Sequence, residues 1–193
     1  MDVKKQLYEY TVDVAQRVVQ SDFDVLAAIV QRLAQAKTDG KTVFTAGNGG
    51  SAATASHVCN DLLKGCRIND REGFKAICLA DSNAIITCLA NDFSYEDIFS
   101  IQLKTFAVSG DVLLVFSGSG HSNNIISLLK TARSLGVFTI GFTGRDGGRM
   151  NDFCDLLLIA PSYSMEQIED MHLLYEHAMI HSLRELFIKI QMP

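Results

Sequence analysis

The sequence predicts an α/β protein built on a doubly wound, five-stranded parallel sheet flanked by helices. Five short apolar runs have the continuous character of strands that are buried on both faces. Helical stretches separate most of these runs, and strands that alternate with helices form βαβ units. Ligands of such sheets bind beyond the carboxyl ends of the strands, so polar residues directly after a run are candidates for a site.

The predicted elements follow the hydrophobic pattern of the chain. The five strands are residues 41–46, 75–80, 112–117, 137–142 and 155–160. The helices between the later strands are residues 83–90, 95–106 and 122–135. A further helix begins at Ser51, directly after the first strand and its turn.

Two more helical patterns occupy residues 4–38. In the first of them, two adjacent apolar stripes that include Leu7 and Val18 make a face broader than one neighbour in the sheet requires. We therefore expect this helix to pack on another subunit.

The last helix is predicted at residues 164–190 and is apolar nearly all round, which is typical of a buried helix. We expect it to form a bundle with the N-terminal helices through which the protein oligomerises. The whole chain, residues 1–193, is predicted to be one domain with an N-terminal helical arm (1–38), an α/β core (41–160) and this C-terminal helix.

The composition excludes several classes of protein. A net charge of −5 without clustered Lys and Arg argues against a nucleic-acid surface. No apolar run reaches the roughly 18 residues of a membrane span, and the first residues lack the apolar core of a signal peptide. We therefore expect a cytoplasmic protein. Its five cysteines form no CxxC pair, which favours reduced thiols over disulfides or a cysteine zinc cluster.

The first polar turn lies between the strand 41–46 and the helix that follows it. Gly47, Asn48, Gly49 and Gly50 form a tight turn, which brings backbone N–H groups, including that of Ser51, to a helix N-terminus. Unpaired donors and the helix dipole favour an anion there. The alternative is a tight connection that binds nothing.

The second polar turn follows the strand 112–117. Its hydroxyls (Ser117, Ser119 and Ser122), together with Gly118 and the start of the next helix, can surround a phosphate without Lys or Arg. An ordinary serine-capped loop is the alternative. Two such turns after strands of one sheet favour a phosphorylated small molecule. A third candidate position, Asn91 with Asp92, could equally be a simple turn.

Two pairs of residues have the chemistry of a metal site. His57 and Asp61 are four residues apart and share one face of a helix, and Glu169 and His177 are eight apart on the last helix. Two histidines and two carboxylates form a nitrogen and oxygen donor set suited to zinc or a similar divalent cation. For each residue alone, a buried hydrogen-bonded histidine or a solvated carboxylate is the alternative.

Together these residues resemble the SIS (sugar isomerase) domain family, and within it the sedoheptulose 7-phosphate isomerases, or phosphoheptose isomerases. The ordered motifs that carry the resemblance are GNGGSA (47–52), AND (90–92), SGDV (109–112), SGSGHS (117–122) and GFTGRDGG (141–148), with His57 and His177. The resemblance implies a five-stranded parallel sheet and a homotetramer whose active sites lie between subunits.

The resemblance also implies roles for the residues that match. The sugar would contact Asn48, Gly49 and Gly50, its hydroxyls Asn91 and Asp92, and its phosphate Ser117, Gly118, Ser119 and Ser122. His57 and His177 would bind zinc, and His177 would also be the general acid. Two positions depart from the family: its catalytic Glu is Asp61 here, and its metal-binding Gln is Glu169. Both changes keep an oxygen donor.

The predicted activity is aldose–ketose isomerisation of a phosphorylated sugar, from sedoheptulose 7-phosphate to D-glycero-D-manno-heptose 7-phosphate through an enediol. A carboxylate, Asp61 or else Glu169, would be the base and His177 the acid, while a divalent cation polarises the carbonyl oxygen. The alternative is a non-catalytic SIS protein that binds a phosphosugar or associates with the replication initiator DnaA. An isomerase of another phosphosugar is a third interpretation.

Overall fold

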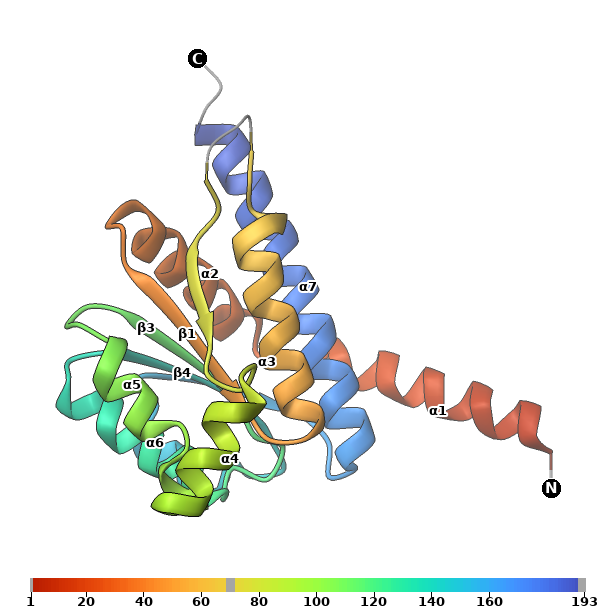
Figure 1. Ribbon diagram of the computed structural model, residues 1–193. Coiled ribbons are helices and arrows are strands. Elements are labelled where there is room, and N and C mark those ends of the chain that lie inside the picture. The colour runs from red at the N-terminus through yellow and green to blue at the C-terminus, as the bar shows by residue number, and fades with distance from the viewer. Residues whose placement is uncertain (1, 69–71, 191–193) are drawn as a thin grey trace.

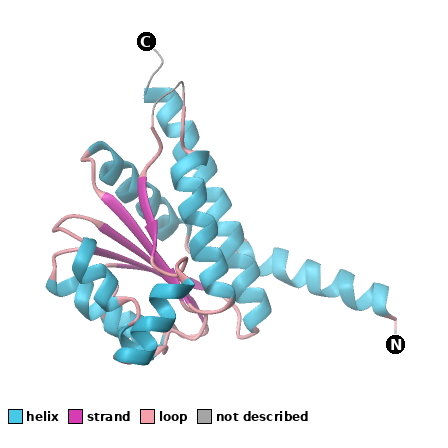
Figure 2. Cartoon of the chain, in the orientation of Figure 1, coloured by secondary structure: helices cyan, strands magenta, loops and turns pink. Residues whose placement is uncertain are grey.

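The computed structural model describes residues 2–68 and 72–190 and has a five-stranded parallel sheet at its centre (Figure 1, Figure 2). The strands are β1 (Thr42–Gly47), β2 (Lys75–Cys78), β3 (Val112–Phe116), β4 (Phe138–Gly144) and β5 (Leu156–Ala160). Their order in the sheet is β2-β1-β3-β4-β5, and all four pairings are parallel. The predicted fold class is confirmed.

Helices cover both faces of the sheet, because alternate side chains of each buried strand point to opposite faces. On one face α2 (Phe23–Thr38), α3 (Gly50–Asn60) and α7 (Met165–Ile190) share an apolar core with the strands. On the other face α5 (Ser100–Phe106) and α6 (Asn123–Ser134) build a second core. In Figure 1 these two helical layers lie on either side of the strands.

Other helical segments are α4 (Asn83–Asp92), a π-helical turn at Asp61–Gly65, and 3₁₀ turns at Tyr95–Asp97 and Gly148–Asp152. Among the described residues, no helix is both long and apolar enough to cross a membrane.

The helix predicted at residues 95–106 is broken into a 3₁₀ turn and α5. The Ser94 hydroxyl donates to the Asp97 carboxylate at 2.8 Å, and the Asp97 N–H donates to the Ser94 carbonyl at 3.1 Å. These bonds close a tight turn at the start of the segment, where the apolar pattern alone predicted regular helix.

The first helix, α1 (Val3–Val18), extends away from the rest of the chain and has no buried residue (Figure 1). Polar bonds hold it to α7: the Tyr10 hydroxyl donates to Asp170 at 2.6 Å, and Gln167 Nε2 donates to Asp13 at 2.7 Å. Most of its apolar face therefore has no partner within the described chain.

The order of the strands fixes where a site can form. β1 and β3 are neighbours, with Gly47 beside Phe116 in the register, but the chain leaves them in opposite directions, toward β2 and toward β4. A doubly wound sheet opens a crevice at such a point. The two polar turns follow these two strands, so they meet at the same edge.

Candidate active site

The two predicted polar turns and one carboxylate of α7 enclose a single pocket. Its volume is about 310 Å³. The lining residues are Asn48, Gly49, Gly50, Ser51, Phe116, Ser117, Gly118, Ser119, Ser122, Met165 and Glu169. The structure thus brings together most of the predicted substrate-binding residues.

The turn after β1 requires glycine at two positions. Gly49 has φ = 55°, in the left-handed region that favours glycine. A Cβ added to Gly50 would lie 2.5 Å from Glu169 Oε2, so a larger residue would clash with that carboxylate. No side chain caps α3, and the first N–H groups of a helix have no partner within it. The turn therefore presents backbone donors to the pocket.

The turn after β3 brings hydroxyls to the start of α6. Ser117 Oγ and Ser122 Oγ lie 3.4 Å apart, and Ser119 Oγ accepts a bond from the His121 N–H at 3.2 Å. Ser122 is the N-cap residue of α6, but its side chain makes no capping bond. Hydroxyls and the unpaired N–H groups of a helix start suit a phosphate group.

A network that the sequence did not predict holds Asn48 in place. Asn48 Nδ2 donates to Asn124 Oδ1 at 2.9 Å, Asn124 Nδ2 donates back to Asn48 Oδ1 at 2.8 Å, and the Tyr95 hydroxyl donates to Asn48 Oδ1 at 2.9 Å. Asn124 is only 2% exposed. The signal in the sequence was an amide, Asn124, directly before the apolar pair Ile125 and Ile126 at the start of a helix, because a buried amide needs partners.

This network borders a second polar pocket of about 430 Å³ beside the first. Its lining residues are Asn48, Tyr95, Glu96, Ser122, Asn123 and Asn124. Asn48 and Ser122 line both pockets, so a ligand longer than a phosphate has polar space to extend into.

The two predicted histidines meet between α3 and α7, which lie side by side (Figure 1). His57 Nε2 and His177 Nε2 are 3.3 Å apart, and His57 Nε2 is 3.6 Å from Asp61 Oδ2. Asp61 begins the π-helical turn that continues α3, where the Cys66 N–H donates to the Asp61 carbonyl five residues back. Such turns are frequent at functional sites.

Glu176, which the sequence analysis did not single out, joins this cluster. Its Oε2 lies 3.3 Å from His177 Nε2, and the candidate ligand atoms of His57, Asp61, Glu176 and His177 all lie within 4.8 Å of one another. Glu176 is 0% exposed, and neither of its carboxylate oxygens has a hydrogen-bond partner among the described residues. Burial, with the nearby Asp61 second, raises the pKa of Glu176 to about 8.

Glu169 lies outside the cluster. It lines the first pocket beside Gly50, whereas His177 lies beside His57. Eight residues span about 12 Å along a helix axis, so the two side chains of α7 reach different levels of α3. The role of Glu169 as a metal ligand stays a prediction.

Asn91 and Asp92 are the last two residues of α4 and line neither of the two pockets. Asn91 Nδ2 donates to Asp92 Oδ1 at 2.8 Å, and both side chains are exposed. Their predicted contact with sugar hydroxyls is therefore still a prediction.

The cluster has the chemistry of a divalent cation site. With zinc bonds of 2.0–2.2 Å to nitrogen and oxygen, tetrahedral ligand atoms are about 3.3–3.6 Å apart. Three pairs of candidate ligand atoms in the cluster are 3.3, 3.3 and 3.6 Å apart. The two orphaned oxygens of Glu176 are the buried acceptors that such a cation would satisfy. The residues of this cluster therefore fit a divalent cation such as zinc.

Comparison with known protein families assigns the chain to a family whose domain covers both polar turns. The family model for the SIS domain matches residues 6–144, and the chain belongs to the SIS domain family.

Proteins of similar sequence identify a group within the SIS domain family. A phosphoheptose isomerase of Aliarcobacter butzleri is 43% identical over 139 residues, which are 72% of this chain and 73% of that protein. A phosphoheptose isomerase of Paramagnetospirillum magneticum is 42% identical over 164 residues, 85% of this chain and 79% of that protein. These similarities confirm the predicted resemblance to phosphoheptose isomerases.

Solved structures give the same result. A phosphoheptose isomerase from Francisella tularensis superposes with a TM-score of 0.90 at 26% identity, covering 96% of this chain and 100% of that chain. The phosphoheptose isomerase from Neisseria gonorrhoeae gives a TM-score of 0.87 at 27% identity, covering 94% and 96%.

Proposed function

We propose that this protein is an aldose–ketose isomerase that converts sedoheptulose 7-phosphate to D-glycero-D-manno-heptose 7-phosphate. The observation that carries the proposal is the pocket in which two anion-binding turns face the carboxylate of Glu169. The similarity to phosphoheptose isomerases over most of the chain supports this substrate.

The turn after β3 would hold the phosphate. The hydroxyls of Ser117, Ser119 and Ser122 donate to its oxygens, and the N-terminus of α6 adds a favourable dipole. Asn48, fixed by Asn124, would orient the sugar chain between the two pockets.

Glu169 is the base that the pocket favours. Its carboxylate would take the proton from the carbon beside the carbonyl, which leaves an enediolate, and protonation of the carbonyl oxygen would give the enediol. The hydroxyl on the deprotonated carbon would then lose its proton to become the aldehyde oxygen, while Glu169 returns its proton to the former carbonyl carbon. Asp61, the other predicted base, lies instead with the histidines.

A zinc or similar divalent cation would be held by His57, Asp61 and His177. When bound, such a cation supplies Lewis acidity and positive charge at the His177 level of α7, about 12 Å along the helix from Glu169. A ring nitrogen bound to a cation carries no proton, so His177 can serve as the predicted acid only through a nitrogen that is not a ligand.

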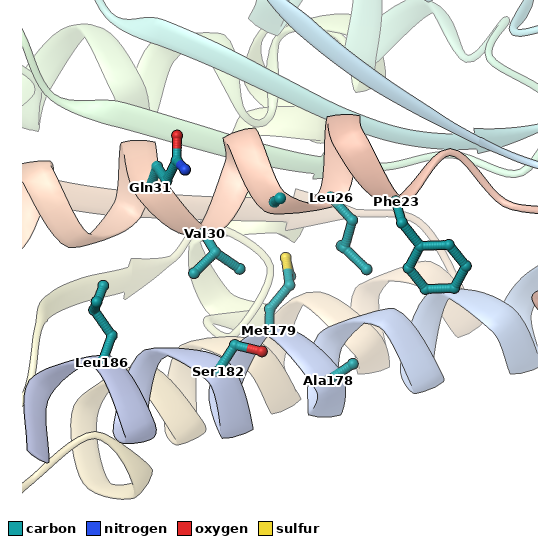
Figure 3. Close-up of a pocket in the computed structure, with 9 residues that line it drawn as sticks. Phe23, Leu26, Val30, Gln31, Ala178, Met179, Ser182 and Leu186 are labelled. Atoms are coloured by element: carbon teal, nitrogen blue, oxygen red, sulfur yellow. The ribbon is translucent and has the colours of Figure 1, made fainter. Parts of the chain in front are cut away.

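The same proposal includes a homo-oligomer, with the predicted tetramer as its expected size. In α1, Val3, Leu7 and Tyr8 are 61%, 66% and 70% exposed. An apolar groove of about 440 Å³ also lies between α2 and α7, where side chains of both helices face one another (Figure 3). The groove residues are Phe23, Leu26, Ala27, Val30, Gln31, Ala178, Met179, Ser182 and Leu186. A second copy of this chain would cover both surfaces.

The test is a direct assay of the reaction. Purified protein with zinc is mixed with sedoheptulose 7-phosphate, and the aldose product is followed by NMR. We expect the heptose 7-phosphate to accumulate in proportion to enzyme. If wild-type protein binds the sugar phosphate in calorimetry but yields no product, the protein is a phosphosugar-binding module and the proposal fails.

A further inference from the structure

Two buried carboxylates of this chain, Asp111 and Glu176, have opposite surroundings. Asp111 is 2% exposed, and its oxygens accept bonds from the Thr42 N–H at 3.0 Å and the Val108 N–H at 2.9 Å. Glu176 is 0% exposed, yet neither of its oxygens accepts a bond from any described residue. Asp111 is thus fully explained by the fold, whereas Glu176 is not.

The Glu176 carboxylate is aimed at the space between α3 and α7. Its Oε2 is 3.3 Å from His177 Nε2, and candidate ligand atoms of His57 and Asp61 lie within 4.8 Å. Four potential donors, two imidazole nitrogens and two carboxylate oxygens, therefore converge on one point. A hydrogen bond between the two imidazoles accounts for their own approach but leaves Glu176 without a partner.

Glu176 and Asp61 bring two carboxyl groups close together, and the Asp61 carboxylate can accept a hydrogen bond from a protonated Glu176. That bond requires one of the two acids to stay protonated. An ionised carboxylate without a counter-charge is strongly unfavourable in a buried position. A cation within the cluster would satisfy the oxygens and the charge together.

We infer that Glu176 is a ligand of the divalent cation, and that it supplies the second carboxylate beside His57, Asp61 and His177 in place of Glu169. Two imidazoles and two carboxylates suit zinc and similar borderline ions, whereas magnesium and calcium prefer all-oxygen sites. With both carboxylates ionised, the set carries two negative charges, which balance a divalent ion.

This assignment gives two roles to two different residues. The sequence makes Glu169 a candidate both for metal ligand and for catalytic base, and Glu176 now takes the role of metal ligand. Glu169 stays free beside Gly50, where it faces both polar turns, and the cation site is complete without it. The inference rests on the proposed function only in that both place a divalent cation at this cluster.

The experiment measures zinc binding and does not use turnover. Metal-free wild type, Glu176→Gln, Glu176→Leu and Glu169→Gln are titrated with zinc by calorimetry against a competing chelator. Each protein is also loaded with Co²⁺, whose visible absorption reports the number and kind of ligands. Circular dichroism and the oligomer size of each variant check its fold.

We expect Glu176→Leu to lower zinc affinity by more than the roughly 10- to 100-fold that loss of an outer partner costs, and to change the Co²⁺ spectrum. Glu176→Gln keeps one neutral oxygen donor, so its affinity should fall between those of wild type and Glu176→Leu. Glu169→Gln should leave both the affinity and the spectrum as in wild type.

Wild-type affinity in both Glu176 variants, or loss of affinity in Glu169→Gln alone, would overturn the inference, as would a wild-type protein that binds no zinc. If Glu176→Leu does not fold, the Gln variant decides. Zinc bound through Glu176 in a protein without isomerase activity would uphold the inference and contradict the proposed function.

Discussion

Three carboxylates near the site have different surroundings, and these surroundings determine which of them can act as a base on a substrate. Glu169 is half-buried and lies against the first turn of α3. Asp61 lies 3.6 Å from His57 Nε2, and Glu176 is fully buried beside His177. A base must reach the substrate, and of the three only Glu169 lines the pocket with the polar turns.

Replacing Glu169 by the isosteric amide tests this assignment. Glu169→Gln should lower kcat by about 10² to 10⁴-fold, the usual contribution of a positioned base, while sugar-phosphate affinity in calorimetry stays near that of wild type. The matched control is Asp170→Asn, which changes the next residue, an exposed carboxylate bonded to Tyr10. Wild-type kcat in Glu169→Gln would transfer the role of base to another residue.

His172 should make stability depend on pH. Burial lowers the pKa of His172 to about 4, although the bond between its Nε2 and the Thr143 carbonyl opposes this shift. The unfolded chain binds the proton below its ordinary pKa of about 6.5, so stability is full above that pH and falls as the pH drops toward 4. Between pH 7.5 and 5.0 the loss due to His172 is about 2 kcal/mol.

The measurement is urea unfolding of wild type and His172→Gln at both pH values. The fall in the free energy of unfolding between pH 7.5 and 5.0 should be smaller in the variant by that amount. An equal fall in both proteins would show that His172 titrates normally in the folded state.

Single residues also show where prediction from sequence ends. His57, Asp61 and His177 were predicted from spacing on helices, and the structure brings them together. Glu176 and Asn124 were missed because their importance depends on burial between elements, which the spacing along one helix does not report.

At the scale of elements, the site depends on two helix starts that follow neighbouring strands. β1 leads into the glycine turn and α3, and β3 leads into the serine turn and α6. Because these strands are adjacent and parallel, both turns line one pocket, and the dipoles of the two helices would act on the same bound anion.

Removing hydroxyls from the second turn should weaken binding without unfolding the protein. Ser119→Ala and Ser122→Ala should each cost roughly 1 to 2 kcal/mol in sugar-phosphate binding, the scale of a hydrogen bond to a charged group. Ser127→Ala, on α6 but outside the pocket lining, is the control. Unchanged calorimetric affinity in the Ser119/Ser122 double variant would remove this turn from the site.

Most elements could be predicted because the apolar pattern is local. The five strands and the helices on both faces were found within a few residues of their ends. The segment at 95–106 differed because the bonds of Ser94 with Asp97 favour a tight turn that hydrophobic periodicity does not encode.

At the scale of the whole molecule, α1 is the element that the described chain leaves uncovered. Its apolar side chains Leu7 and Tyr8 are exposed, polar bonds tie Tyr10 and Asp13 to α7, and only the end of the helix, at Val14 and Val18, packs against the apolar core. A surface of this kind is typical of a subunit contact.

A charge placed on this helix should disrupt assembly. We expect wild-type protein to be a stable oligomer at micromolar concentration in light scattering, and Leu7→Arg to shift it toward smaller species. Val108→Arg is the control, because Val108 is comparably exposed, at 62%, but lies between α5 and β3. A wild-type monomer, or equal effects of both substitutions, would contradict the role of α1.

The convergence of the site is also a property of the whole molecule. The sequence placed polar residues after strands, but only the strand order β2-β1-β3-β4-β5 makes the first and third strands neighbours. Similarly, only the packing of α7 along α3 decides that His177 meets His57 and that Glu169 meets Gly50.

The most direct test of isomerase chemistry is proton exchange at carbon. Wild-type protein with zinc is incubated in deuterated water with sedoheptulose 7-phosphate, and with five- and six-carbon ketose phosphates for comparison. We predict that NMR will show solvent deuterium entering the carbon beside the carbonyl of sedoheptulose 7-phosphate, because enediol formation releases that proton even when net conversion is slow. No exchange with any of these sugars, in a protein that binds them, would contradict an enediol-forming isomerase.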